Sequence, residues 1–307
     1  MSKLLGLMAV LGLVAGVAGC DHDPAAVRDQ GWTEVWEDTF DYTSLDQMDD
    51  VWELNPPFST YFPGEVQLMD NPADTDPSDG TDRMVRLRTG PFQTRSDGLW
   101  DWAMISTNGP RRTGTEPNYP DARSFQGPLY VEAWVRYTEN RHTWPAFWMF
   151  SARKNELWPG ESCSSPPLPQ ELTAEWDIME NGYSAGETSS HFFTAIHRNT
   201  SDGTADGWCG IPDVQRTDSQ QMPGTTLGDW HLWGGHWRTD GQLCTYLDDE
   251  LLNCEPAYDS FDQPLVVKFS MARIPTAWCS GDPGGCPPLP GELVLDISNV
   301  RVLEPPG

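Results

Sequence analysis

Short segments in which apolar and polar residues alternate recur along this chain, and they restrict its fold more than any other feature does. Residues 128–137 show the pattern best, because every second position of a β-strand points to the same face. The apolar face is formed by Leu129, Val131, Ala133 and Val135, and the other face by Tyr130, Glu132, Trp134 and Arg136. Similar strands are predicted at residues 32–40, 84–88, 143–150, 191–198, 265–273 and 292–303, with two more in 230–248 around the turn Thr239-Asp240-Gly241. No helical pattern is long enough for a core helix, so we predict an all-β antiparallel sandwich.

One predicted strand, Ala174 to Asn181, carries three carboxylates in an otherwise apolar run. Glu175 and Asp177 are two positions apart and therefore share a face. Glu180 would point to the opposite face of a regular strand, but a β-bulge around Ile178-Met179 would return it to the face of the other two. Grouping like charges costs stability, so we interpret the cluster as functional; a solvated acidic strand is the alternative.

Retaining glycoside hydrolysis is the chemistry that most directly needs such a set. One carboxylate attacks the anomeric carbon, while a second, about 5–5.5 Å away, protonates the leaving oxygen and later activates water. We expect Glu175 to be the nucleophile, Asp177 to hydrogen-bond to it, and Glu180 to be the acid/base. Crowding by Glu175 and Asp177 should raise the pKa of Glu180, and this pKa should fall once Glu175 becomes a glycosyl ester.

Acidic residues outnumber basic ones by 46 to 19, which gives a formal net charge of −27. Nucleic acids bind to basic surfaces, so this excess argues strongly against a nucleic-acid partner and more weakly against a sulfated glycan. The chain also has 15 tryptophans, whose rings either stack on sugars or fill the core of a sandwich. There is no break in composition, so residues 31–305 are predicted to form one catalytic domain.

The N-terminus is predicted to be a processing segment. Lys3 precedes an apolar run from Leu4 to Val17, which is too short to span a membrane stably. The run ends in Val17-Ala18-Gly19-Cys20, which resembles the lipobox of bacterial lipoproteins. The resemblance implies a signal peptide at 1–19, lipidation of Cys20, a tether at 20–30 and an exported protein anchored to a bacterial membrane. A plain secretory signal is the alternative.

Six of the seven cysteines remain once Cys20 is set aside, and an even number in an exported protein suggests up to three disulfides. Cys244 and Cys254 flank a predicted hairpin and are symmetric about Asp249, so they could pair across its strands. Cys279 with Cys286 would close a glycine-rich loop, and Cys163 with Cys209 is left by elimination. A zinc site is disfavoured because the chain has no CxxC pair.

Four motifs occur in order along the chain: Trp-Pro-Ala-Phe-Trp at 144–148, Glu-x-Asp-x-x-Glu at 175–180, a hairpin over 237–248 and a closing strand over 296–302. Together they resemble glycoside hydrolase family 16, in its subgroup with a bulged active strand. The resemblance implies a concanavalin-like β-jelly-roll with a concave substrate cleft, and the roles given above for Glu175, Asp177 and Glu180.

The same resemblance suggests substrate-binding residues. Trp144 and Trp148 would stack on sugars near the scission point, with core packing as the alternative for each. His197 would hydrogen-bond a sugar hydroxyl, unless its role is structural. Trp176 replaces the small aliphatic residue usual at its position, but it would face away from the cleft.

The chain also departs from the family pattern. Many members hold a structural calcium ion with residues of an Asp-Glu-Phe segment and of the final strand. Here the segment is Asp38-Thr39-Phe40, which lacks the glutamate, although Asp296 of the final strand is retained. We expect no cofactor to be required. The insertion at 151–173 is longer than usual, so subsites cannot be transferred from the family.

A neutral glucan fits this acidic chain best, so the expected function is that of a laminarinase-like endo-β-1,3-glucanase. Agarase or other galactan hydrolysis and transglycosylation on the same fold stay open, as does a non-catalytic glycan-binding lipoprotein. The expected partners are a polysaccharide and, through the lipid anchor, a membrane; the chain is expected to be a monomer. A serine or cysteine hydrolase is unsupported, because no Gly-x-Ser-x-Gly is present.

Overall fold

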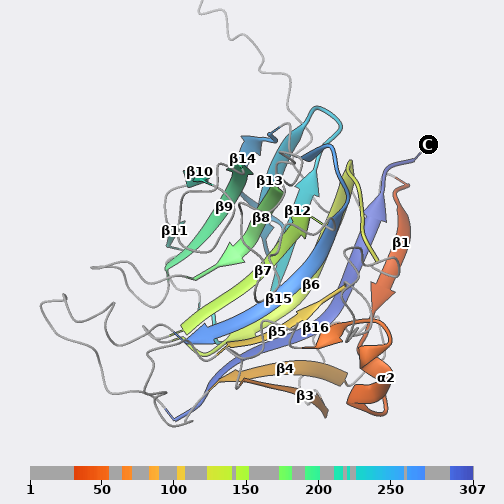
Figure 1. Cartoon of the computed structure of the whole chain (residues 1–307), viewed down its shortest axis with the longest axis vertical. Helices are drawn as coiled ribbons and strands as arrows, with labels where there is room; N and C mark the ends of the chain where they lie inside the picture. The colour runs from red at the N-terminus through yellow and green to blue at the C-terminus, as the bar shows by residue number, and fades with distance from the viewer. Residues whose placement is uncertain are drawn as a thin grey trace, which may run out of the picture.

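Two antiparallel β-sheets lie face to face in the computed structural model (Figure 1). The structure describes residues 31–54, 64–70, 83–89, 102–107, 123–139, 143–151, 173–181, 191–200, 211–216, 220–221, 226–258, 261–273 and 291–306. The predicted signal peptide, Cys20 and the tether lie outside these residues, as do Cys163, Cys209, Cys279 and Cys286. No helix within the described ranges is long and apolar enough to cross a bilayer.

The back sheet has the strand order β14-β13-β12-β6-β16-β4-β3, and β1 also pairs with β16. Its strands are β1 (Thr33–Asp38), β3 (Glu65–Asp70), β4 (Arg83–Thr89), β6 (Leu129–Tyr137), β12 (His231–Trp237), β13 (Gln242–Leu247), β14 (Glu250–Pro256) and β16 (Leu293–Glu304).

The front sheet has the order β10-β9-β8-β7-β15-β5-β2, with β11 paired to β9. Its strands are β2 (Glu53–Leu54), β5 (Trp102–Ser106), β7 (Thr143–Ser151), β8 (Thr173–Glu180), β9 (His191–Thr200), β10 (Ile211–Arg216), β11 (Gln220–Gln221) and β15 (Leu265–Arg273). A single helix, α2 (Leu45–Asp49), occurs in the described residues, and Ser44 caps it by accepting a hydrogen bond from the Gln47 N–H.

The predicted sandwich is therefore confirmed, and each predicted strand is present with ends within two residues. The short strands β2, β3, β5, β10 and β11 were not predicted. Of the strand residues 129–137, the positions predicted to be apolar are all buried in the core between the sheets. Phe147 and Phe269 stack there with ring centroids 4.7 Å apart. Trp52, Trp176 and Trp233 are fully buried, so these tryptophans fill the core and do not contact sugars.

Trp176 packs against a glycine of the opposite sheet. A Cβ atom built on Gly235 of β12 would lie 2.7 Å from Cη2 of Trp176 and 2.8 Å from Cδ1 of Ile178. Contacts this short do not occur between carbon atoms, so only glycine fits at position 235. The missing side chain on β12 makes the room that the large indole on β8 requires.

Asp296 lies on the outer face of the back sheet, where two guanidinium groups bind it. Arg86 on β4 donates from Nε and Nη2 over 2.7 and 2.9 Å, and Arg136 on β6 donates from Nε over 2.8 Å. The carboxylate is almost fully buried, so this pairing replaces its hydration.

Asp38 is also fully engaged by protein donors. Its oxygens accept hydrogen bonds from the Phe40 N–H, the Tyr42 hydroxyl and the Trp52 indole N–H. A calcium ion needs several oxygen ligands that are free to face it. With Asp38 satisfied internally and Asp296 held by two cations, these two residues do not fit the calcium site that the sequence resemblance raised.

The hairpin of β13 and β14 carries the one disulfide in the described residues. Cys244 and Cys254 are directly opposite each other in the register, and their sulfurs are 2.01 Å apart. The pairing predicted from their symmetry about Asp249 is confirmed. The other two predicted disulfides lie outside the described residues.

Candidate active site

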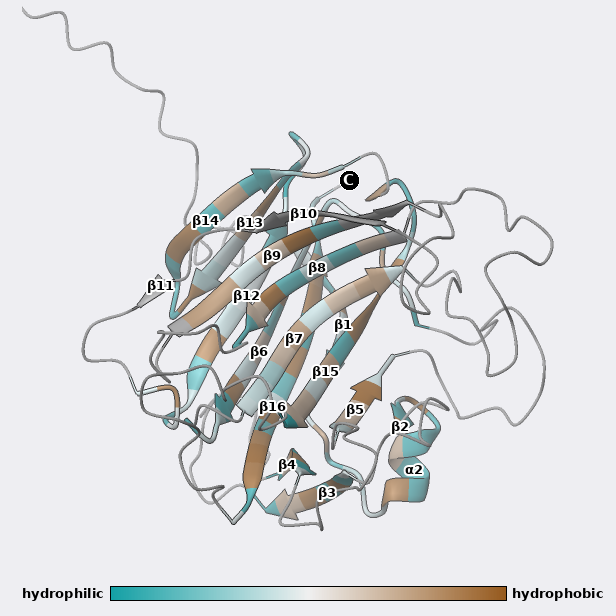
Figure 2. Cartoon of the chain, turned by 60° about the vertical axis from the view of Figure 1, so that its left-hand side comes forward, coloured by the Kyte–Doolittle hydropathy of each residue, from teal (hydrophilic) through white to brown (hydrophobic). Residues whose placement is uncertain are grey.

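Strand β8 runs between β7 and β9 in the front sheet (Figure 2). Shifts in its register with both neighbours show that it contains the predicted bulge. On β7, Phe150 is opposite Glu175 and Trp148 is opposite Asp177, but the register then shifts, so that Ala146 is opposite Glu180. Ile178 is the extra residue. Because directly opposite residues of paired strands share a face, the shift brings the three carboxylates to one side of the sheet.

The residues between the carboxylates explain why the bulge forms. Trp176, Ile178 and Met179 are all buried in the core. With Glu175 and Asp177 facing outward, a regular strand would also turn Met179 outward and would bury Glu180. The bulge buries both apolar side chains and keeps the charge of Glu180 out of the core, and each of these effects favours it.

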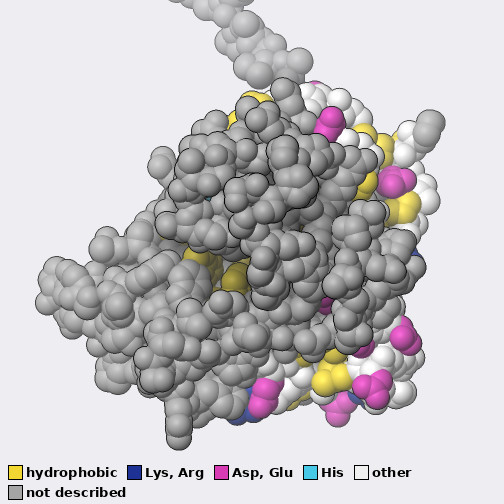
Figure 3. Space-filling model, in the orientation of Figure 1, with side chains coloured by type: hydrophobic (Ala, Val, Ile, Leu, Met, Phe, Trp, Pro, Cys, Tyr) yellow, Lys and Arg dark blue, Asp and Glu magenta, His cyan; other side chains and the backbone are white. Residues whose placement is uncertain are grey.

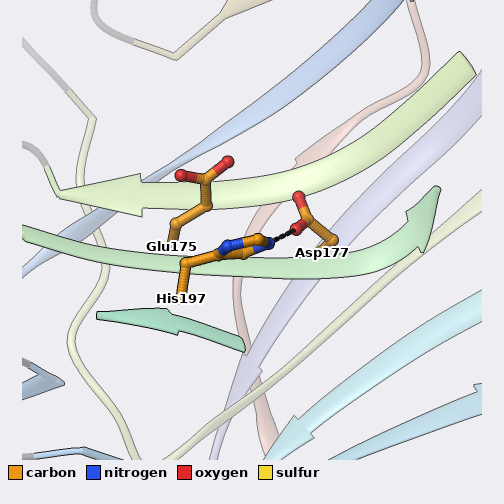
Figure 4. Close-up of side chains that lie close together, drawn as sticks. All are labelled: Glu175, Asp177 and His197. Carbon is orange, nitrogen blue, oxygen red and sulfur yellow. Dashed lines mark ion pairs between the residues drawn. The ribbon is translucent and has the colours of Figure 1, made fainter. Parts of the chain in front are cut away.

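His197 on β9 completes the cluster. It lies opposite Glu175 in the register, and its Nε2 is 2.8 Å from Oδ2 of Asp177 (Figure 4). The side chains of Glu175, Asp177 and His197 bring potential ligand atoms within 4.8 Å of one another, so they could also hold a divalent cation. Such an ion would have to compete with the contact between Asp177 and His197. The structure thus places His197 against a carboxylate, which sequence reasoning had not anticipated.

Glu175 has a strongly perturbed ionisation. Burial, followed by the negative charge of Asp177, raises the pKa of Glu175 to about 8, while His197 and Lys268 oppose the rise. The sequence led us to expect the raised pKa at Glu180. The expectation for Glu180 stays a prediction, whereas at Glu175 burial and the charge of Asp177, two residues away on the same face, are the main causes of the rise.

Glu180 receives a hydrogen bond from Trp144 of β7. The indole Nε1 of Trp144 donates to Oε1 of Glu180 over 2.6 Å. An N–H donor of this kind fixes the position of the carboxyl group. The predicted stacking of Trp144 on a sugar stays a prediction, and the structure adds a contact with the proposed acid/base.

Trp148 lies on the same face as Trp144, opposite Asp177. The ammonium of Lys268 on β15 lies over its ring, 4.8 Å from the centroid, and Phe150 makes an edge contact at 5.7 Å. One face of the indole is therefore covered, and only the other could stack on a sugar. Lys268 was missed by the sequence reading, although its alternation with Val267 and Phe269 marks it as a residue of the outward face.

The surface of the described residues reflects the excess of acidic groups. In the space-filling view, Asp and Glu side chains lie along the right-hand and lower margins, with a few basic side chains near them at the lower edge (Figure 3). One ion pair joins β3 and β4, where Arg88 Nη1 lies 3.2 Å from Oε2 of Glu65.

Comparisons with known proteins identify the fold. No family profile and no curated protein sequence matches the chain. Among solved structures, it is similar to a glycoside hydrolase family 16 endo-glucanase from Bacteroides ovatus, with a TM-score of 0.55 and 18% identity over 88% of this chain and 100% of that one. It is also similar to an endo-β-1,3-glucanase from Pyrococcus furiosus, with a TM-score of 0.50 and 17% identity over 89% and 94%.

A third similar structure is an endo-β-galactosidase from Clostridium perfringens that releases GlcNAcα1-4Gal, with a TM-score of 0.56 and 14% identity over 90% of this chain and 63% of that one. Sequence identities this low establish architecture and leave activity to be argued from the site. The chain has the jelly-roll sandwich fold of glycoside hydrolase family 16 enzymes, as its four motifs predicted.

Proposed function

We propose that this protein is a retaining endo-β-glycosidase of glycoside hydrolase family 16 that cleaves a β-1,3-glucan. The observation that carries the proposal is the bulge in β8, which puts Glu175, Asp177 and Glu180 on one face of the front sheet. In a solvated acidic strand there would be no reason to bury two neighbouring residues and so turn the third carboxylate to the face of the other two. The interpretation as a solvated strand is therefore not supported.

The two glutamates divide the reaction into two displacements. In the first, the carboxylate of Glu175 attacks the anomeric carbon, the glycosidic bond breaks, and Glu180 gives its proton to the leaving oxygen. In the second, Glu180 takes a proton from water, the water oxygen attacks the anomeric carbon, and the ester bond to Glu175 breaks. The Trp144 N–H holds Oε1 of Glu180 and so positions this carboxyl for both proton transfers.

Asp177 and His197 support the nucleophile. Their contact at 2.8 Å fixes Asp177 beside Glu175. Because the carboxyls interact, the first proton to leave the cluster makes the loss of a second more difficult. The cluster therefore holds one proton over a range of pH, and the first displacement needs that proton on Glu180 and an ionised Glu175.

A neutral glucan is the proposed substrate because the chain is strongly acidic and because two similar structures are named as glucanases. The similarity to an endo-β-galactosidase favours a galactan as the second candidate. In the glucanase proposal, residues 31–305 form the catalytic domain of a monomer.

A substrate panel tests the proposal. Laminarin, lichenan, agarose and carrageenan are incubated with the protein, and products are analysed by mass and by NMR for the anomeric configuration formed first. We expect cleavage of laminarin with β-configured products; an α-configured first product would refute retention. Cleavage of agarose alone would support the galactan, and products longer than the substrate would indicate transglycosylation. Binding without cleavage of any glycan would support the glycan-binding alternative.

Variants connect the activity to the site. Glu175→Gln and Glu180→Gln should each lower kcat by roughly a thousandfold or more, because each residue acts in the transition state. Glu250→Gln, an exposed carboxylate on the edge strand β14, is the matched control and should retain full activity. Wild-type rates in either active-site variant would overturn the assignment.

We further propose that the protein is exported and lipid-anchored at Cys20. The sequence at 17–20 supports this, and the disulfide between Cys244 and Cys254 fits an oxidising compartment. Incorporation of labelled palmitate into the wild-type chain, but not into Cys20→Ser, is the expected result. A soluble, unlabelled wild-type protein would favour the plain secretory signal.

A further inference from the structure

Asn181 is a buried amide that directly follows the proposed acid/base. Strand β8 ends at Glu180, and consecutive residues of a strand point to opposite faces. Because Glu180 points outward from the front sheet, Asn181 points toward the other sheet, and only 5% of its surface is exposed. An amide removed from water costs free energy unless it is hydrogen-bonded, so its partner in the interior is informative.

A tyrosine of the back sheet is that partner. Nδ2 of Asn181 donates a hydrogen bond to the hydroxyl of Tyr137 over 3.2 Å. Tyr137 is the last residue of β6, and its ring is buried in the core. Its backbone N–H donates to the carbonyl oxygen of Leu227 over 3.0 Å, so the hydroxyl extends from a fixed point. The bond therefore joins the end of β8 to the opposite sheet.

The backbone at the end of β8 is held on β7 by a bond that runs in one direction. The Asn181 N–H donates to the carbonyl oxygen of Pro145 over 3.1 Å. A proline has no N–H, so Pro145 cannot donate in return. Strand ends open more easily than strand centres, and the side-chain bond to Tyr137 opposes this opening from the side of the core.

The position of Glu180 depends on this strand end. Trp144, the residue before Pro145 on β7, donates from Nε1 to Oε1 of Glu180 over 2.6 Å. Movement of Asn181 away from Pro145 would therefore also move Glu180 relative to Trp144. A misplacement of about 1 Å in a catalytic group can lower a rate by about a hundredfold, so the attachment of this strand end bears on catalysis.

We propose that Tyr137 and Asn181 are positioning residues, whose hydrogen bond across the sandwich keeps Glu180 aligned with Trp144 for proton transfer. This inference rests on the proposed function. Both residues act through Glu180, since one lies in the core and the other faces it. Their loss should therefore affect the proton transfer to the leaving oxygen and leave the attack by the nucleophile intact.

Two variants and two substrates test this distinction. Tyr137→Phe removes the hydroxyl and keeps the ring, and Asn181→Ala removes the amide. Tyr130→Phe is the matched control, because it deletes the hydroxyl of another buried tyrosine of β6, on the outer face of the back sheet. The substrates are the glycan that the wild type cleaves and a dinitrophenyl glycoside of the same oligosaccharide. Dinitrophenolate leaves without a proton, so kcat/KM for this glycoside does not depend on the acid.

We expect kcat/KM for the glycan to fall about tenfold or more in Tyr137→Phe and in Asn181→Ala. For the dinitrophenyl glycoside it should change by less than about twofold. The double variant should lose about as much as one single variant, because the two residues share one bond. Tyr130→Phe should match the wild type on both substrates. Equal losses on both substrates, or no loss on the glycan, would overturn the proposal; Asn181→Ala decides it if Tyr137→Phe does not fold.

A second measurement needs no activity. The indole N–H of Trp144 is followed by NMR in protein labelled at the tryptophan indole nitrogens, with Trp144→Phe to assign the signal. Its hydrogen bond to Glu180 shifts the proton signal downfield, and we expect an upfield move in Tyr137→Phe and Asn181→Ala but not in Tyr130→Phe. An unmoved signal would overturn the inference. If the wild type cleaves neither substrate, the proposed function fails, while the Trp144 signal still decides whether Tyr137 and Asn181 position Glu180.

Discussion

Replacing Glu175 with glutamine should stabilise the fold, and by an amount that depends on pH. The pKa of Glu175 is raised from its ordinary value of 4.5 to about 8. A carboxyl with a raised pKa contributes its full stability below pH 4.5, where it is protonated in both the folded and the unfolded chain. That contribution is lost as the pH rises toward 8, because the unfolded chain ionises freely and the folded one resists ionisation.

The size of the effect follows from the same two values. The difference between 4.5 and about 8, at about 1.4 kcal/mol for each pKa unit, corresponds to roughly 5 kcal/mol. This is an upper limit, since water reaches the partly exposed carboxylate and screens part of its charge. We therefore expect Glu175→Gln to raise the free energy of unfolding by about 2–5 kcal/mol at pH 9 and by little at pH 4.5.

Urea denaturation followed by tryptophan fluorescence measures this difference. Wild type, Glu175→Gln and the control Glu250→Gln are compared at several pH values from 4.5 to 9. The m-value, which is the slope of the unfolding free energy against urea concentration, should be the same for all three proteins. The gain in Glu175→Gln should grow up to about pH 8 and level off above it. A gain that is independent of pH, or that shrinks as the pH rises, would refute the reasoning about Glu175.

Three further predictions follow from the site and the two sheets. In the wild type, kcat/KM should fall about tenfold for each pH unit below about 8, because Glu175 must be ionised to attack; a flat profile down to pH 6 would contradict this. Asp296→Ala should lower the free energy of unfolding by about 3–5 kcal/mol, because Arg86 and Arg136 lose their shared partner. The loss, measured by urea denaturation, should be the same in EDTA and in calcium, and a loss seen only in calcium would restore Asp296 as a metal ligand. The double variant Cys244→Ser/Cys254→Ser should lose roughly 2–3 kcal/mol, the chain-entropy value for two cysteines 10 positions apart, and a loss well below 1 kcal/mol would mean that the hairpin is ordered without its disulfide.

The features that depend on residues close together in the sequence were well predicted. Alternation identified the faces of the longer strands, and the spacing of Glu175, Asp177 and Glu180 required a bulge, which the structure contains. The symmetry of Cys244 and Cys254 about a turn predicted their disulfide. Each of these inferences uses residues that are close in the sequence, where the period of a strand fixes the direction of a side chain.

Contacts between distant strands could not be predicted in this way. Lys268 lies beside Trp148 because β15 pairs with β7, an arrangement that no local pattern in either strand reveals. The clamp on Asp296 likewise joins β4, β16 and β6, so the sequence suggested a calcium ligand where the structure has an ion pair. The raised pKa of Glu175 was not predicted, because the burial that dominates it could not be inferred from the sequence.

Gly235 makes the active strand depend on a residue of the other sheet. A methyl group at this position would clash with Trp176 and Ile178, the core residues on either side of Asp177. It would therefore displace the strand that carries the carboxylates without contacting the carboxylates themselves. The space between β8 and β12 is fixed, so the side chains at positions 176 and 235 compete for the same volume. A smaller residue at 176 would therefore allow a larger one at 235. Exchange of catalytic strands between proteins of this fold should therefore succeed only when the matching residue of β12 is transferred as well.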